Sequence, residues 1–284
     1  MARKPLPTVK PARRSPMTWL MCLLLVLAAG AVVHGVEAGR KTAPTPAPTP
    51  YVLNVEKLAE VLESRSVTVR SPAGQGSGTI FVHGKKQYVL TAGHVVQEQR
   101  EGASEAEIVM GLAGMDGFYY DLQVLRYDHP EDIVVGRVIA YSHPERGDDL
   151  AILELDGAFN LPYGGAFIEL FRQPLMGEEI YHIGGFLGLP NGNSFSHGPI
   201  SRVHRTLREC CGDHDFMQTA CPAYPGSSGG GMFYEDGALA GVLVRGANAT
   251  LNYCVPASRV VRWAKANGFM WVFDPSEHPQ CVTH

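Results

Sequence analysis

Three residues in separate segments of the chain have the types needed for nucleophilic acyl chemistry. Ser228 stands in the glycine-rich run G-S-S-G-G, His94 follows a T-A-G tripeptide, and Asp149 directly precedes the apolar run L-A-I-L. A serine hydroxyl is a weak nucleophile at neutral pH, so it needs a nearby base, and that base needs an orienting group. Imidazole titrates near neutral pH, and a carboxylate can fix its tautomer and stabilise its cation. We therefore predict His94 as general base, Asp149 as its orienting acid and Ser228 as nucleophile.

Two of these assignments have a rival at the neighbouring position. Asp148 also precedes the apolar run, but Asp149 is the residue directly before it in the sequence. Ser227 is the other serine of the glycine-rich run, but the register G-x-S-G-G places the nucleophile at Ser228. We favour Asp149 and Ser228 on these grounds.

The glycines beside Ser228 predict how the reaction would be stabilised. A sharp turn at Gly226 can bring the backbone N–H groups of Gly226 and Ser228 to one point, where they would form an oxyanion hole. Each such donor stabilises the transition state by about 3 kcal/mol. Gly229 and Gly230 allow close backbone approach, since they carry no Cβ.

The segments that must hold these residues read as short strands. Apolar runs of four to six residues recur from Ser66 onward, punctuated by Gly, Pro, Asp and Asn, which predicts a closed all-β architecture. Helical spacing of apolar residues predicts a helix over 53–64 and another over 258–267, the second capped by Gly268. The predicted strands are 67–69, 79–82, 87–90, 107–110, 121–125, 137–140, 150–155, 179–183, 200–203, 215–219, 230–233, 239–244 and 251–255.

The N-terminal part has a different composition. Basic residues precede an apolar run of signal-peptide length, with small residues placed for cleavage after Ala38. The same run is just long enough to span a bilayer if it is kept, so residues 1–38 are a signal peptide or a signal anchor. The alternating prolines of 39–52 predict an extended linker. We expect an extracytoplasmic domain over 53–284, secreted or held by one N-terminal membrane segment, in a periplasm or at a cell surface.

The chain resembles the protease domain of the HtrA (DegP-type) branch of the chymotrypsin fold, from about Val55 to Ala266. The order His, Asp, Ser along the chain is that of chymotrypsin-type proteases. The fragments that carry the resemblance are Gly76–Phe81, Tyr88–Val96, Asp149–Leu153, Ile183–Leu189, Gln218–Thr219 with Gly226–Gly230, and Tyr253–Ser258. The resemblance implies a chymotrypsin-like double β-barrel with a short N-terminal helix and a C-terminal helix.

The chain departs from the family pattern at several points. Ala220 stands where the family has Asp, and Gly231 where it has Pro. We expect an insertion between Gln97 and Val134, and no PDZ domain after residue 267. By resemblance, the pocket for the substrate side chain before the scissile bond is lined by Pro222, Ala223, Val242, Leu243 and Val244, which suggests cleavage after small or medium aliphatic residues. Arg245, next to this strand, is either a solvated surface arginine or a selector of acidic side chains.

Five cysteines follow the N-terminal segment, and an oxidising compartment favours disulfides between them. We expect Cys221 to pair with Cys210 or Cys211, and Cys254 to pair with Cys281. A structural zinc on Cys210, Cys211, His214 and Cys221 is the alternative, although the usual finger spacing is missing. We expect no metal and no cofactor in the reaction.

The composition limits the classes of molecule that the chain can bind. The chain has 24 basic and 28 acidic residues, a net charge of −4, and therefore no basic footprint for nucleic acid. The predicted partner is a protein or peptide substrate, with the membrane as a second partner if the N-terminal segment is uncleaved. The motifs predict a serine endopeptidase acting on exported or membrane-associated proteins. The alternatives are a catalytically silent peptide-binding or scaffold protein on the same fold, and a viral or phage polyprotein-processing protease.

Overall fold

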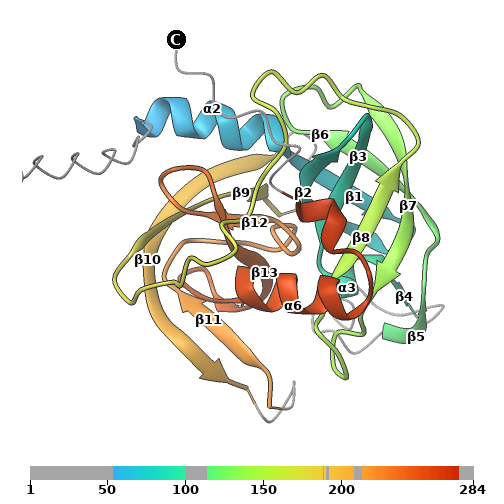
Figure 1. The fold of residues 1–284 in the computed structure, drawn as a ribbon. Coiled ribbons are helices and arrows are strands. Elements are labelled where there is room, and N and C mark those ends of the chain that lie inside the picture. The colour runs from blue at the N-terminus through green and yellow to red at the C-terminus, as the bar shows by residue number, and fades with distance from the viewer. Residues whose placement is uncertain (1–53, 100–113, 188, 190–191, 208–212, 275–284) are drawn as a thin grey trace, which may run out of the picture. The chain divides into compact units, whose positions relative to one another are not determined.

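The apolar runs of the sequence fold into two closed six-stranded barrels (Figure 1). The computed structural model describes residues 54–99, 114–187, 189, 192–207 and 213–274. The predicted signal segment 1–38, the linker 39–52 and the predicted strand 107–110 lie outside these residues. The all-β double-barrel prediction is confirmed.

The first barrel is antiparallel, with strand order β1-β2-β3-β8-β7-β6. Its interior is filled by side chains from alternate positions, such as Val67, Ile80, Val89 and Leu153, none of which is exposed. The strands are β1 (Ser66–Ser71), β2 (Gly74–His83), β3 (Lys86–Thr91), β6 (Asp121–Arg126), β7 (Ile133–Tyr141) and β8 (Ala151–Leu155).

The second barrel has strand order β10-β11-β14-β13-β12-β9. Its core includes Ile180, Ile200, Met217 and Met232. The strands are β9 (Glu179–Gly185), β10 (Asn193–Thr206), β11 (Asp215–Thr219), β12 (Gly231–Phe233), β13 (Leu239–Asn248) and β14 (Leu251–Pro256).

Helices at the two ends of the described chain close the space between the barrels. Helix α2 (Val55–Arg65) begins at Asn54, whose side chain accepts a hydrogen bond from the Lys57 backbone N–H at 2.7 Å. Helix α6 (Ala257–Ala266) ends before Gly268, which has the predicted left-handed backbone (φ 77°). A 3₁₀ turn, η1 (Met270–Phe273), follows. These elements and both barrels contribute to one apolar cluster that joins the two halves.

Several strands are longer than predicted or were missed. Strand β10 has 14 residues, and most of its side chains are exposed or half-buried, so it lacks the apolar pattern on which the prediction relied. Within the expected insertion, β4 (Gln97–Gln99) and β5 (Gly114–Phe118) form a separate two-stranded sheet that was not predicted. The two strands pair with each other, and Gln97 is their one buried residue.

The predicted disulfides are wrong for the two cysteines that the structure describes. Cys221 and Cys254 are free thiols, and both side chains are buried in the apolar core of the second barrel. Burial raises the pKa of the Cys221 thiol to about 12 and that of Cys254 well above its usual value. Their expected partners Cys210, Cys211 and Cys281 lie outside the described residues.

One segment between β8 and β9 exposes large apolar side chains: Phe171 is 92% exposed, and Leu175 and Met176 are exposed as well. Arg172 pairs with Glu178 at 2.7 Å and with Asp236 at 2.5 Å, so the segment is tied to its surroundings by charge.

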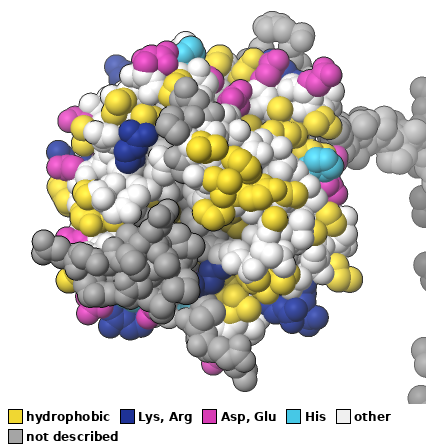
Figure 2. All heavy atoms as spheres, turned by 180° about the vertical axis from the view of Figure 1, so that it is seen from behind, with side chains coloured by type: hydrophobic (Ala, Val, Ile, Leu, Met, Phe, Trp, Pro, Cys, Tyr) yellow, Lys and Arg dark blue, Asp and Glu magenta, His cyan; other side chains and the backbone are white. Residues whose placement is uncertain are grey.

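Seen from behind, the molecule shows a continuous apolar patch on its surface (Figure 2). Among the described residues, no helix is long and apolar enough to cross a membrane.

Candidate active site

His94 and Asp149 are brought together by the pairing of two strands. Strands β3 and β8 are antiparallel, with Thr91 opposite Ala151. His94 comes just after β3, in the short helix α3 (Gly93–Val96), and Asp149 comes just before β8. The ends of two neighbouring strands therefore carry both side chains.

The carboxylate of Asp149 faces the His94 ring. Both of its oxygens lie 3.1 Å from His94 Nδ1, and Oδ1 also accepts the His94 backbone N–H at 2.9 Å. A proton on Nδ1 that is donated to Asp149 leaves Nε2 as the acceptor, which is the tautomer a general base needs. The rival Asp148 instead accepts a hydrogen bond from Arg259 Nε at 2.6 Å, so its carboxylate is used in tying the loop to α6.

The backbone around Asp149 is unusual. Asp149 has φ 54°, in the left-handed region that few residues other than glycine adopt. Gly93 lies against it: a Cβ there would stand 2.3 Å from Ser142 O and 3.2 Å from Asp149 Oδ1. A glycine before His94 is therefore required for the two loops to approach.

The charge of Asp149 is stabilised although its side chain is only 3% exposed. Burial alone would raise its pKa. The charge and hydrogen bonds of His94, together with the charge of Arg245, outweigh burial and hold the pKa of Asp149 below its usual value. Asp149 is thus a carboxylate at neutral pH.

The segment 226–230 forms a tight loop between β11 and β12, with positive φ at Gly226 (100°) and Gly229 (86°). Both sides of the loop are tied to neighbouring strands. The Gly229 N–H donates to Leu243 O at 2.7 Å, and Ser228 O accepts from the Ser77 N–H, also at 2.7 Å. A Cβ on Gly229 would stand 2.3 Å from Ser77 O and 2.8 Å from Ala92 N, so only glycine fits there.

The orientation of the Gly226 N–H follows from its neighbour. The Pro225 carbonyl accepts the Leu187 N–H at 2.8 Å. Because a peptide bond is planar and trans, the Gly226 N–H of the same unit points away from Leu187. Leu187 itself has φ 53°, a strained backbone for leucine.

The two serines of the loop lie in different surroundings. Ser227 is buried, and its hydroxyl donates to Gly185 O at 2.9 Å and accepts from the Tyr224 N–H at 3.3 Å. Ser228 is half-buried. Ser227 thus has a structural role, and Ser228 is the more exposed of the two residues.

The predicted substrate-binding residues lie along β13 and before the loop. β13 pairs with β12 only as far as Val242, but with β14 as far as Asn248. Within the described part of the chain, the edge from Val244 to Asn248 has no strand partner. Ala223 is tied to Ala249 O by its N–H at 2.9 Å, and Pro222 O accepts from Ser196 Oγ at 2.6 Å.

Arg245 is not the solvated surface arginine that was one of the two readings of the sequence. It is half-buried, its Nη2 donates to Pro144 O at 3.1 Å, and its Nε is buried without a hydrogen-bond partner among the described residues. The charge of Arg245 is one of the causes that lower the pKa of Asp149.

Sequence reasoning missed two buried residues beneath the loop, Ser77 and His182. His182 Nδ1 donates to Gly231 O at 2.9 Å, while Nε2 is buried and unpartnered within the described chain. Burial lowers the pKa of His182 to about 4, so its ring is neutral at neutral pH. A histidine inside an apolar strand was the available signal. The described residues contain no cluster of His, Cys, Asp and Glu that could hold a metal ion.

Comparisons with known proteins identify the family of the chain. The family described as trypsin-like peptidase domain matches residues 76–242. Protease Do-like 1, chloroplastic, of Arabidopsis thaliana is 25% identical over 220 residues, which cover 75% of this chain and 44% of that protein. Human serine protease HTRA3 is 24% identical over 217 residues, covering 74% and 43%. The chain spans less than half the length of these curated relatives.

Solved structures of proteases share the fold. The serine endoprotease from Yersinia pestis superposes with a TM-score of 0.54 at 23% identity, covering 79% of this chain and 68% of that one. The Rv3671c protease of M. tuberculosis, in its inactive form, gives 0.55 at 18% identity, covering 74% and 92%. With the barrels, the motifs and the matched residues in agreement, the chain belongs to the trypsin-like peptidase domain family and resembles its HtrA-type serine proteases.

Proposed function

We propose that the chain is a serine endopeptidase in which Ser228, His94 and Asp149 form a catalytic triad. The observation that carries the proposal is the pair of contacts from the Asp149 carboxylate to His94 Nδ1, at 3.1 Å, on a loop framework that leaves Ser228 accessible. Family membership supports the same activity.

The proposed reaction proceeds through an acyl-enzyme. Ser228 Oγ attacks the scissile carbonyl carbon while His94 Nε2 takes its proton. The negative oxygen of the tetrahedral intermediate accepts hydrogen bonds from the N–H groups of Gly226 and Ser228. The His94 imidazolium then protonates the leaving amine, and a water molecule activated by His94 hydrolyses the ester. Asp149 stabilises the imidazolium throughout.

We propose that the substrate binds as an added strand. The free edge of β13 from Val244 to Asn248 offers backbone groups for pairing with an extended peptide. Val242, Leu243 and Val244, with Pro222 and Ala223, favour small or medium aliphatic side chains before the scissile bond. Proteins outside the cytoplasm are the proposed substrates, and this part of the proposal rests on the N-terminal sequence and the family likeness.

The test uses the purified full chain and a fluorescent fluorophosphonate, read by intact mass. Wild type and Ser227→Ala should each take up one probe, and Ser228→Ala should take up none. Labelling of Ser228→Ala, or equal labelling of Ser227→Ala and Ser228→Ala at a low level, contradicts the assignment. A folded wild type that is never labelled contradicts the activity itself.

A further inference from the structure

One buried residue of the first barrel contacts two carbonyls of the nucleophile loop in the second barrel. Ser77, in β2, has no exposed surface. Its backbone N–H donates to Ser228 O at 2.7 Å, and its side-chain hydroxyl donates to Gly226 O, also at 2.7 Å. Gly226 and Ser228 are the two residues whose N–H groups form the proposed oxyanion hole.

The hydrogen bonds of the Ser77 hydroxyl are completely used. A hydroxyl has one proton to donate and can accept two. The Gly226 carbonyl can only accept, so the Ser77 proton lies there. The oxygen accepts the Gly185 N–H at 3.0 Å and contacts the Tyr127 hydroxyl at 2.6 Å. Tyr127 must therefore be the donor of that last bond, and a directed relay runs from Tyr127 through Ser77 to Gly226.

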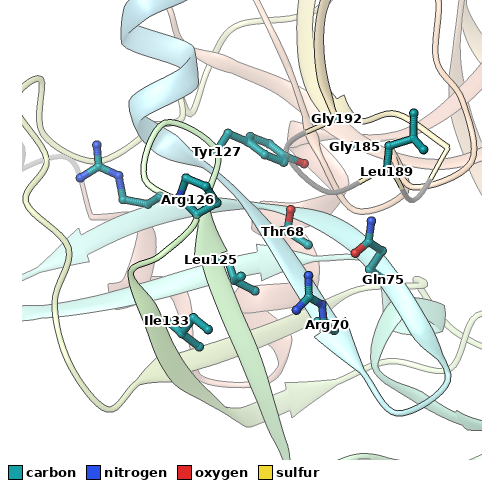
Figure 3. A pocket seen from close by; sticks show the side chains of 11 residues that line it. Thr68, Arg70, Gln75, Leu125, Arg126, Tyr127, Ile133, Gly185, Leu189 and Gly192 are labelled. Carbon is teal, nitrogen blue, oxygen red and sulfur yellow. The ribbon is translucent and has the colours of Figure 1, made fainter.

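Tyr127 is held in place for this donation. Burial raises the pKa of its phenol to about 12, so the hydroxyl keeps its proton over the whole range in which a serine peptidase works. The residue lines a cavity of about 250 Å³ between the barrels, with Thr68 and Gly185 among its neighbours. Figure 3 shows the Tyr127 hydroxyl directed toward the segment that carries Gly185.

The loop needs hydrogen bonds of this kind because the residue whose backbone N–H must be oriented is a glycine, Gly226. Glycine adopts positive and negative φ with similar ease, so the backbone at Gly226 (φ 100°) has no intrinsic preference that keeps its N–H facing the substrate. Contacts must supply that preference. Leu187 holds the carbonyl before Gly226, and Ser77 holds the carbonyl of Gly226 itself.

We propose that Ser77 and Tyr127 are positioning residues that keep the oxyanion hole assembled. This rests on the proposed function, since it assigns a role in the same reaction. Neither residue touches the substrate. Their effect is on the rate of the chemical step, with little effect on substrate binding.

The first test compares Ser77→Ala with Ser66→Ala. Both serines are fully buried in the first barrel, and each hydroxyl donates to a backbone carbonyl at 2.7 Å, but the Ser66 acceptor is Leu62, in α2. The fluorophosphonate is titrated to separate the maximal labelling rate from the apparent affinity. We expect Ser77→Ala to lower the maximal rate roughly 10- to 100-fold, with the affinity changed less than about 3-fold. The pH midpoint of labelling should not move.

The second test compares Tyr127→Phe with Tyr88→Phe, another buried tyrosine of the first barrel. Tyr127→Phe should lower the maximal rate about 3- to 10-fold, since Ser77 Oγ still donates to Gly226 O but no longer accepts a hydrogen bond from the phenol. Tyr88→Phe should label like wild type. If Ser77→Ala fails to fold, this second pair decides the question.

The outcomes separate the two proposals. A labelled wild type with no rate difference within either pair overturns the relay alone. A shift in the pH midpoint also overturns it, because the residues would then be acting on the base. A folded wild type that labels no faster than Ser228→Ala overturns the proposed function, and the relay with it.

Discussion

The two barrels contribute to the site in different ways. The first barrel supplies His94 and Asp149 from the ends of two paired strands, and their mutual contacts lie within that barrel. The second barrel supplies Ser228 from a loop with two positive-φ glycines, and this loop is held partly by Ser77 of the first barrel. The proposed base and its orienting acid are thus preorganised by their own barrel, whereas the proposed nucleophile depends on contacts across the interface. A substitution at the interface should therefore disturb the position of Ser228 more than that of His94.

The largest expected effect separates two adjacent carboxylates. Asp149→Asn should lower the fluorophosphonate labelling rate by about 10⁴-fold with little loss of stability, because the wrong tautomer of His94 is then favoured. Asp148→Asn should do the opposite: it removes the partner of the nearly buried Arg259 and lowers the free energy of unfolding, but labelling persists. Labelling rates and urea unfolding of both variants check this. Equal losses of rate in the two variants would contradict the assignment of Asp149.

A second prediction separates backbone conformation from available space. Gly84→Ala should cost about 1–2 kcal/mol, since φ is 60° there but nothing lies near the added Cβ. Gly229→Ala carries the same backbone cost plus about 1–3 kcal/mol of overpacking against Ser77 and Ala92, and it should abolish labelling. Chemical denaturation and probe uptake measure both effects. Retained labelling in Gly229→Ala would mean that the loop can move away from the first barrel.

The third prediction concerns acid stability of the second barrel. His182 has a pKa of about 4 in the folded protein and an ordinary value of 6.5, so the unfolded chain binds more protons between these values. Stability should rise with pH across this window, and lowering the pH from 7 to 4.5 should cost about 2–3 kcal/mol through His182. His182→Gln should remove that part of the pH dependence in urea unfolding, while His204→Gln, at an exposed site, should keep it. A pH dependence unchanged in His182→Gln would contradict the assignment.

The smallest expected effect tests the guanidinium of Arg245, in β13. Arg245→Gln should lower cleavage of peptides with an acidic residue before the scissile bond about 5-fold relative to neutral peptides, a difference of about 1 kcal/mol. The ratio of kcat/KM for matched acidic and neutral peptides checks it, and 0.5 M salt should reduce the ratio in wild type. An equal loss for both peptides would mean that Arg245 acts through Asp149 only.

The sequence predicted those parts of the molecule in which a short local pattern of residues is enough to determine the structure. His94, Asp149 and Ser228 each stand in a short motif, and the apolar runs that became β3, β8 and β11 were recognisable because burial fills them. Strand β10 was largely missed because most of it lies on the surface, and β4 and β5 because few of their side chains are buried.

Other features depend on contacts that no local pattern encodes. Ser77 and Gly226 are 149 positions apart, and their hydrogen bond forms only once both barrels have closed. The environment of Arg245 is set by a turn 101 positions earlier, at Pro144. The disulfides were predicted from cysteine spacing and compartment, which say nothing about where the strands would bury Cys221 and Cys254.

The two buried thiols have a practical consequence. With a pKa of about 12, Cys221 has only about one thiolate in 10⁵ molecules at pH 7, and the thiolate is the form that attacks alkylating reagents. Burial also raises the pKa of Cys254 well above its usual value. Both thiols therefore react only when the second barrel opens. The rate of their alkylation in native buffer, without denaturant, measures how often this barrel opens spontaneously.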